Sequence, residues 1–223
     1  MAITCQIHNH IATIATDDGK VNVMTNDWLT QFSRSLDDVC ESGAKVLVMS
    51  GRPKFFSAGV DVKAVTQMDA AALKKQSDYF ALVALKLYGL PIPTIALVTG
   101  HAIAGGFIMA SACDYRFGVD GPFKYQLSEI VIGVAVADWV PVLFEASLPR
   151  SVFESVALSA RPLSPREMLD NGFLMGLETE PAAAARRTEA LAAQLAQLST
   201  EAYATSKAMM RSARIKSTLA GLG

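Results

Sequence analysis

Apolar residues fall in short blocks along the chain, and these blocks alternate between the spacing of strands and the spacing of helices. Short runs that are apolar throughout, or that alternate with polar residues, predict strands. The runs are 3–7, 11–16, 45–50, 94–99 and 114–119. The first two runs are separated by Asn9-His10, which predicts a hairpin.

Longer segments carry the spacing of amphipathic helices. Asn26 is the predicted N-cap of a helix, whose apolar face comprises Trp28, Leu29, Phe32, Leu36 and Val39. A second helix is predicted over 70–90, with an apolar surface formed by Leu73, Phe80, Leu82, Leu85 and Leu87. It must end by Pro91 because proline cannot continue a helix.

The chain after Trp139 is predicted to be largely helical. It includes an alanine-rich helix over 182–198 and a final helix with Lys207, Arg211 and Lys216. Because strands alternate with helices before this region, the pattern predicts an α/β fold with crossover helices. No linker composition or internal repeat suggests a second domain within the 223 residues.

The composition excludes several classes of function. Half of the residues are hydrophobic (51%) and 18% are charged, as in a globular domain. The formal net charge is −1 without blocks of like charge, so we expect neither nucleic acid nor a membrane surface as the principal partner. The N-terminal residues lack a secretory pattern, and Cys5, Cys40 and Cys113 lack metal-ligand spacing. We therefore expect a cytoplasmic protein with reduced thiols and no bound metal.

Two segments of small residues follow predicted buried strands and precede predicted helices. They are Phe55-Phe56-Ser57-Ala58-Gly59-Val60-Asp61 and Gly100-His101-Ala102-Ile103-Ala104-Gly105-Gly106. Small side chains leave backbone N–H groups uncovered at the start of a helix, where an anion can bind. Two such turns that face each other could hold one oxygen between them and stabilise an oxyanion.

These segments, together with ACDYR (112–116) and SEIVIG (128–133), resemble the crotonase (enoyl-CoA hydratase/isomerase) superfamily. The resemblance runs to about residue 175 and continues weakly into 206–213. It implies one crotonase-like domain over 1–223, with a ββα spiral over 1–175 and a helical C-terminal region over 176–223. It also implies a homo-trimer or a dimer of trimers, acyl-CoA thioester substrates, and no cofactor beyond the coenzyme A of the substrate.

The same resemblance assigns site residues. It places one oxyanion-hole N–H on Ala58 and the other on Gly105, and it places the coenzyme A contact along Ala58, Gly59, Val60 and Asp61. The loop 21–24 takes the place of a segment beside the pantetheine. Two glutamates hold a water in the hydratases, and the first of these positions is Ile108 here. The second position is Glu129, which is present.

A single carboxylate indicates a double-bond isomerase, since isoleucine neither transfers a proton nor positions water. An apolar pocket would raise the pKa of Glu129 and let it act as base and then as acid. The resemblance is therefore closest to the Δ3,Δ2-enoyl-CoA isomerase branch. Two alternatives stay open. One is an enoyl-CoA hydratase or another acyl-CoA lyase or hydrolase, recruiting Asp138 or a further group, and the other is a non-catalytic acyl-CoA-binding protein.

Other residues have ordinary structural interpretations. Asp138 is expected at the surface or at a helix cap, and Asp114 is expected to fix a turn through backbone hydrogen bonds. Phe107, Trp139, Val140 and Phe144 are candidates for the walls of an acyl groove, although such a cluster is more often core.

Overall fold

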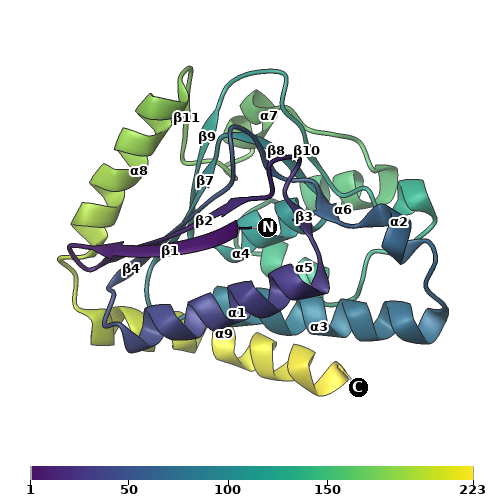
Figure 1. Cartoon of the computed structure of the whole chain (residues 1–223), viewed down its shortest axis with the longest axis horizontal. Coiled ribbons are helices and arrows are strands. Elements are labelled where there is room, and N and C mark those ends of the chain that lie inside the picture. Colours follow the sequence, from purple (N-terminus) through teal and green to yellow (C-terminus); the bar gives the residue numbers. More distant parts are fainter. Residues whose placement is uncertain (1, 223) are drawn as a thin grey trace.

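The computed structural model describes residues 2–222, and a six-stranded sheet forms its centre (Figure 1). The strand order is β1-β2-β4-β7-β9-β11, with β1 and β2 antiparallel and the other neighbours parallel. Their bounds are β1 (Ala2–His8), β2 (Ile11–Asp17), β4 (Val46–Ser50), β7 (Thr94–Val98), β9 (Tyr115–Val119) and β11 (Gly176–Glu178).

Two smaller parallel sheets lie beside the large one. The first has the order β10-β8-β5, with β5 (Lys54–Ser57), β8 (Gly100–Ile103) and β10 (Tyr125–Gln126). The second pairs β3 (Val23–Met24) with β6 (Gly59–Val60). The chain therefore repeats a strand of the large sheet followed by a strand of the small sheet, as in β4-β5 and β7-β8. Because β5 and β8 pair side by side, the segments that follow them are neighbours.

Helices cover both faces of the large sheet (Figure 1). On β4, Leu47 and Met49 belong to the main core, whereas Val46 and Val48 face a smaller core under α8. Burial on both faces explains why this strand is apolar throughout rather than alternating. The helices are α1 (Asn26–Glu41), α2 (Val62–Val65), α3 (Ala70–Tyr88), α4 (Gly105–Ala112), α5 (Val140–Phe144), α6 (Arg150–Ser159), α7 (Pro165–Asp170), α8 (Pro181–Leu195) and α9 (Thr200–Gly221), with the short 3₁₀ helix η1 (Ile130–Ile132).

Most predicted elements are confirmed, with local corrections. The short strands β3, β5, β6, β8 and β10 were not predicted, and β5, β6 and β8 lie largely inside the segments predicted as small-residue turns. Thr25 rather than Asn26 caps α1, because the Thr25 hydroxyl accepts the N–H of Trp28 at 3.2 Å. The second predicted helix ends at Tyr88, and Leu82 on it is 48% exposed instead of buried. The strand β11 lies inside the region predicted to be helical, since pairing with β9 completes the edge of the large sheet.

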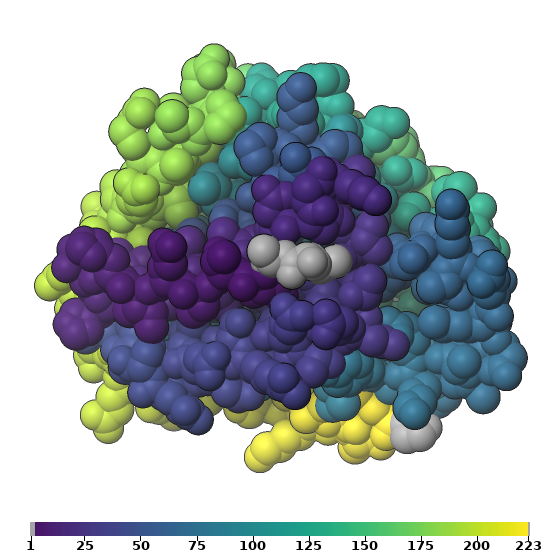
Figure 2. Space-filling view, in the orientation of Figure 1, coloured from purple at the N-terminus to yellow at the C-terminus, as the bar shows by residue number. Residues whose placement is uncertain are grey.

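Figure 2 shows the face on which the hairpin β1-β2 and α1 lie, with α8 and α9 at its margins. The helix α9 is attached by a buried ionic cluster around Asp114. Asp114 accepts the N–H of Thr94, the first residue of β7, at 2.8 Å. The predicted backbone hydrogen bond is confirmed, but its donor lies on a neighbouring strand and not in a turn. Asp114 also pairs with Lys207 at 2.8 Å and Arg211 at 2.7 Å, both on α9. Burial lowers the pKa of the Lys207 ammonium, and Asp114 offsets part of this effect.

Asp114→Asn is expected to destabilise the protein by about 3–5 kcal/mol, because it leaves the charge of Lys207 buried without its partner. The free energy of unfolding, measured by urea denaturation, checks this. Asp120→Asn is the matched control, since Asp120 pairs with Arg166 at 3.7 Å on the surface, and its effect should stay within about 0.5 kcal/mol. Equal effects of the two changes would contradict a structural role for the cluster.

Candidate active site

The two small-residue turns meet directly. Gly59 has a positive φ of +81°, and a Cβ added to it would lie 2.9 Å from the backbone nitrogen of Gly105 and 2.8 Å from the carbonyl oxygen of Ile103. No side chain fits in this space, so glycine is required at position 59 for both conformation and contact. The prediction that the two turns face each other is confirmed.

The second turn leads into the N-terminus of α4. Ala104 precedes this helix with a φ of +45°, and its side chain cannot cap the first N–H groups. Within the described residues, no hydrogen-bond acceptor is present for the N–H of Gly105. Gly106 is small for a packing reason, because its Cβ would lie 2.5 Å from the carbonyl oxygen of Ser57. The N–H of Gly105 is therefore available to an oxygen placed at the turn, and the helix end favours negative charge there.

The first turn corrects one predicted donor. The N–H of Ala58 donates to the carbonyl oxygen of Val21 at 2.9 Å, and that of Gly59 donates to the Ser57 hydroxyl at 2.9 Å. Ala58 thus does not supply a free oxyanion donor and does not line the cavity described below. Val60, two residues further on, does line it. The loop 21–24 lies beside this turn as expected, through Val21 and through the pairing of β3 with β6.

A cavity of about 100 Å³ opens beside the two turns. Its walls come from α2, α3, the N-terminal part of α4, and the segment from Ser128 to Val140. The lining residues are Val60, Val62, Val65, Leu73, Gln76, Ser77, Phe80, Ala104, Gly105, Ile108, Ser128, Glu129, Ile132, Val134, Ala135, Ala137, Trp139 and Val140. Glu129 is the one member of this set with an ionisable side chain, so any proton transfer inside the cavity falls to it.

Glu129 precedes η1 and projects into this apolar setting. Its Oε2 atom is buried and has no hydrogen-bond partner among the residues that the structure describes. Burial raises the pKa of the Glu129 carboxyl, although backbone N–H groups at Glu129 and Ser128 oppose part of the shift. A carboxyl in this environment exchanges a proton more readily near neutral pH than an exposed glutamate does.

Ile108 lines the same cavity and is only 3% exposed. In this chain, an aliphatic side chain that lines the cavity therefore occupies the position expected to carry the first glutamate in the hydratases. The cavity holds one carboxylate rather than two.

Sequence reasoning missed one wall of the cavity. Leu73, Gln76, Ser77 and Phe80 line it from a single face of α3. Their spacing of three and four residues was a helical signal, but it did not show which cavity the face would meet. Ser77 also accepts a hydrogen bond of 3.0 Å from the indole N–H of Trp139. Of the four candidates for the walls of an acyl groove, Trp139 and Val140 line this cavity, whereas Phe107 and Phe144 pack against each other in the core with ring centroids 4.9 Å apart.

Two further candidates, Asp138 and Asp61, do not line the cavity. Asp138 is exposed and absent from the cavity lining, and Trp139 occupies the cap position of α5. Asp61 is exposed and caps α2 by accepting the N–H of Lys63 at 2.9 Å. Within residues 2–222, no cluster of three or more histidine, cysteine, aspartate or glutamate side chains could hold a metal ion. In the same range, no helix is long and apolar enough to cross a bilayer.

The chain combines an α/β fold with a cavity beside two facing turns and one carboxyl group that lines this cavity. Comparison with known proteins identifies the family to which this combination belongs. The model of the enoyl-CoA hydratase/isomerase family matches residues 6–221. The chain belongs to this family, the crotonase superfamily predicted from its motifs.

Individual relatives carry both activities in their names. A probable enoyl-CoA hydratase of Bacillus subtilis is 27% identical, covering 97% of this chain and 84% of the relative. The human mitochondrial enoyl-CoA delta isomerase 1 is 27% identical, covering 91% and 68%. The crystal structure of a hydratase/isomerase family protein from Pseudomonas syringae superposes with a TM-score of 0.91 at 27% identity, covering 99% and 94%. The predicted crotonase fold is confirmed.

Glu129→Gln is expected to stabilise the protein at about pH 7 but not below about pH 4. Because the folded-state pKa of Glu129 is raised, the folded protein binds more protons than the unfolded chain between the two pKa values. Stability therefore falls as the pH rises through this window, and glutamine removes the loss. Thermal unfolding at both pH values, with the exposed Glu189→Gln as control, measures the difference. A gain that is equal at both pH values would contradict the burial of an ionisable Glu129.

Proposed function

We propose that the protein is an enoyl-CoA isomerase that moves the double bond of a 3-enoyl-CoA thioester to the 2-position. The observation that carries this proposal is the single ionisable group of the cavity, Glu129, in a cavity where Ile108 stands in place of a second carboxylate. A shift of a double bond needs one proton acceptor that returns the same proton. Addition of water needs, in addition, polar groups that hold the water.

The reaction follows from this arrangement. The Glu129 carboxylate takes a proton from C2 of the 3-enoyl thioester, and the C–H electrons move toward the thioester carbonyl to form a dienolate. The negative oxygen accepts hydrogen bonds from the backbone N–H groups of Gly105 and Val60, with Val60 taking the place first assigned to Ala58. Glu129 then returns the proton to C4, which yields the conjugated 2-enoyl thioester. No atom is gained or lost, and the carboxylate is regenerated.

The apolar lining supports each half of this cycle. Burial raises the pKa of Glu129, so the carboxylate is a stronger base than an exposed one and its protonated form persists long enough to act as acid. The start of α4 has no side-chain cap, which supports a role for the N–H of Gly105 as a donor to the thioester oxygen on which charge develops. The predicted contact of Gly59 and Asp61 with coenzyme A and the predicted homo-trimer stay predictions.

Hydration is the second candidate, because relatives named as hydratases match the chain at similar identity. Conjugated 2-enoyl-CoA distinguishes the two, since hydration removes its near-ultraviolet absorbance and isomerisation of 3-enoyl-CoA creates it. We expect absorbance to rise with 3-enoyl-CoA and to stay constant with crotonyl-CoA. Binding of coenzyme A thioesters without turnover of either substrate would instead favour a non-catalytic protein.

Glu129→Gln should abolish isomerisation, because an amide cannot accept the C2 proton, while the affinity for a saturated acyl-CoA stays close to that of the wild type. Turnover is followed by the absorbance of the conjugated product and affinity by calorimetry. Asp138→Asn is the control, since this exposed carboxylate lies outside the cavity, and it should retain full activity. Normal turnover by the Glu129 variant would remove this residue from the mechanism.

Gly105→Val should lower kcat by about 10²–10³-fold, the scale of a lost oxyanion donor. A Cβ at Gly105 would lie 3.1 Å from the Phe80 ring, 3.4 Å from the Met24 sulfur and 3.5 Å from Gly59 Cα, so a branched side chain must push the two turns apart. Gly105→Ala carries only the Cβ and should show a smaller loss of kcat. Steady-state kinetics on both variants, with circular dichroism to verify folding, tests this order. Equal kcat values for valine and glycine would contradict it.

A further inference from the structure

The turn at residues 57–59 is held by one internal hydrogen bond and by two hydrogen bonds to the loop that follows β2. The Ser57 hydroxyl donates to the carbonyl oxygen of Asn22 at 2.5 Å and accepts the N–H of Gly59 at 2.9 Å. The N–H of Ala58 donates to the carbonyl oxygen of Val21 at 2.9 Å. Ser57 is 1% exposed and Asn22 is 2% exposed, so water does not compete for these bonds.

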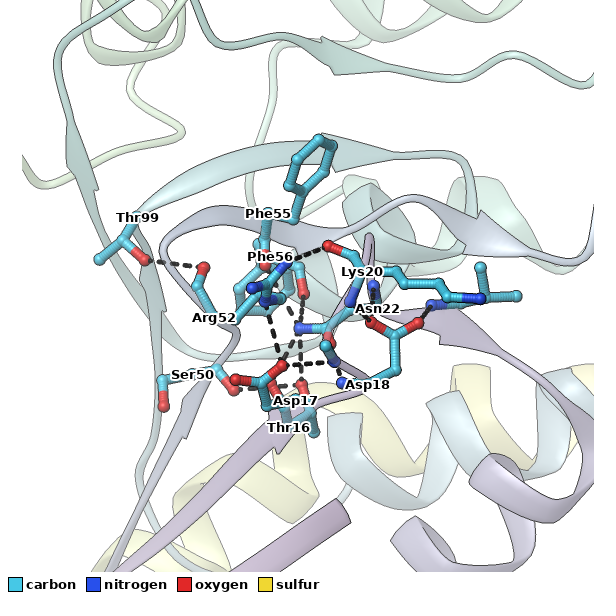
Figure 3. Close-up of polar contacts among 12 residues, drawn as sticks. Thr16, Asp17, Asp18, Lys20, Asn22, Ser50, Arg52, Phe55, Phe56 and Thr99 are labelled. Atoms are coloured by element: carbon cyan, nitrogen blue, oxygen red, sulfur yellow. Dashed lines mark hydrogen bonds and ion pairs between the residues drawn. The ribbon is translucent and has the colours of Figure 1, made fainter. Parts of the chain in front are cut away.

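The loop is itself fixed by the side chain of Asn22, as Figure 3 shows. Its amide nitrogen donates to the carbonyl oxygens of Thr16 at 2.8 Å and Phe56 at 3.2 Å. Its amide oxygen accepts the N–H of Asp18 at 3.0 Å. Asn22 therefore connects the end of β2 to β5, and its own backbone adopts a positive φ of +55° that asparagine tolerates.

The backbone of this turn continues into β6, which pairs with β3, but the side chains of Ala58 and Gly59 make no hydrogen bonds that hold it. Gly59 has no side chain and takes a positive φ, so its conformation is not restricted by packing of a side chain. The next residue, Val60, faces the cavity. A donor at this position acts on the thioester oxygen only within about 2.7–3.1 Å, so small rotations at Gly59 would misplace it.

We infer that Ser57 and Asn22 are positioning residues for the oxyanion site, acting through the backbone of Gly59 on the N–H of Val60. This inference rests on the proposed function where it concerns the rate of isomerisation. Its structural part concerns only how strongly the site polarises the carbonyl group of a bound thioester. Ser57 connects the loop to the turn with one hydroxyl, and Asn22 holds the loop in place. Neither side chain is among the residues that line the cavity.

Ser57→Ala isolates the hydroxyl, because it retains the Cβ that packs close to Gly106. Arg52→Gln is the matched control, since Arg52 contacts the same loop at the Lys20 carbonyl oxygen and pairs with Asp17 at 3.0 Å (Figure 3). Among residues 2–222, its side chain makes no hydrogen bond or ion pair with residues 57–59. The probe is cinnamoyl-CoA, whose aromatic enoyl thioester absorbs further to the red when its carbonyl oxygen accepts strong hydrogen bonds. The same proteins are assayed for isomerisation of 3-enoyl-CoA.

We expect the red shift of bound cinnamoyl-CoA to be clearly smaller in Ser57→Ala than in the wild type and unchanged in Arg52→Gln. The kcat of Ser57→Ala should fall about 10- to 100-fold, up to the loss caused by removing an oxyanion donor, with KM close to wild type. The melting temperature should fall by a few degrees, because the Asn22 carbonyl oxygen and the Gly59 N–H lose a buried partner. Ser57→Cys keeps a weak donor and acceptor and should recover part of both signals. A wild-type red shift in Ser57→Ala at saturating probe would overturn the inference, and so would a lack of red shift in the wild-type protein.

Failure of the proposed function gives a different pattern. In that case the wild type would not isomerise 3-enoyl-CoA, yet the red shift and its dependence on Ser57 would still report the oxyanion geometry. If Ser57→Ala does not fold, the comparison of Ser57→Cys with the wild type supplies the test. An unchanged red shift in a folded Ser57→Cys with unchanged kcat would then count against a positioning role.

Discussion

The close approach of two backbone turns is the constraint on which the rest of the site depends. Parallel pairing of β5 with β8 brings the residues that follow them together, and Gly59 then lies so close to Gly105 that a Cβ would come within 2.9 Å of its nitrogen. Larger residues at these positions would separate the two turns. The repeated order of a strand in the large sheet followed by a strand in the small sheet is what creates this neighbourhood, so the fold and the site have the same geometric origin.

Around that junction, the protein keeps one carboxyl group in an apolar cavity. The environment that raises the pKa of Glu129 also makes its ionised form unfavourable, and its Oε2 atom has no partner within residues 2–222. A cation, or a hydrogen-bond donor beyond the backbone N–H groups at Glu129 and Ser128, would stabilise the carboxylate further and make it a weaker base. Elsewhere the protein treats a buried carboxylate in the opposite way, because Asp114 is paired with Lys207 and Arg211 and serves to attach α9. The contrast separates a carboxylate suited to reaction from one that supports structure.

The expected oxyanion donors show which features of a site a sequence motif predicts and which it does not. The small-residue segments were correctly expected to form two facing turns, and Gly105 has the environment expected of a donor. Ala58 does not, because the carbonyl oxygen of Val21 takes its N–H. That acceptor belongs to a loop more than thirty residues earlier in the chain, so the segment around Ala58 gives no sign of it. The same applies to Ser57. Its local sequence indicates an ordinary turn residue, and only the fold shows that its hydroxyl donates to the carbonyl oxygen of Asn22.

The sequence by itself determined the α/β class, most strands and helices, the family and the single carboxylate, since these depend on local periodicity, proline and glycine positions, and the residue types at Ile108 and Glu129. Tertiary structure decided the details that arise from contacts between distant segments. It added β11 to the sheet edge, placed one face of α3 against the cavity, and consumed the N–H of Ala58. Periodicity predicts which residues share a face of a helix or strand, but the contacts of that face depend on tertiary packing. Whether a backbone N–H is free depends in the same way on an acceptor from a distant segment, which the local sequence does not contain.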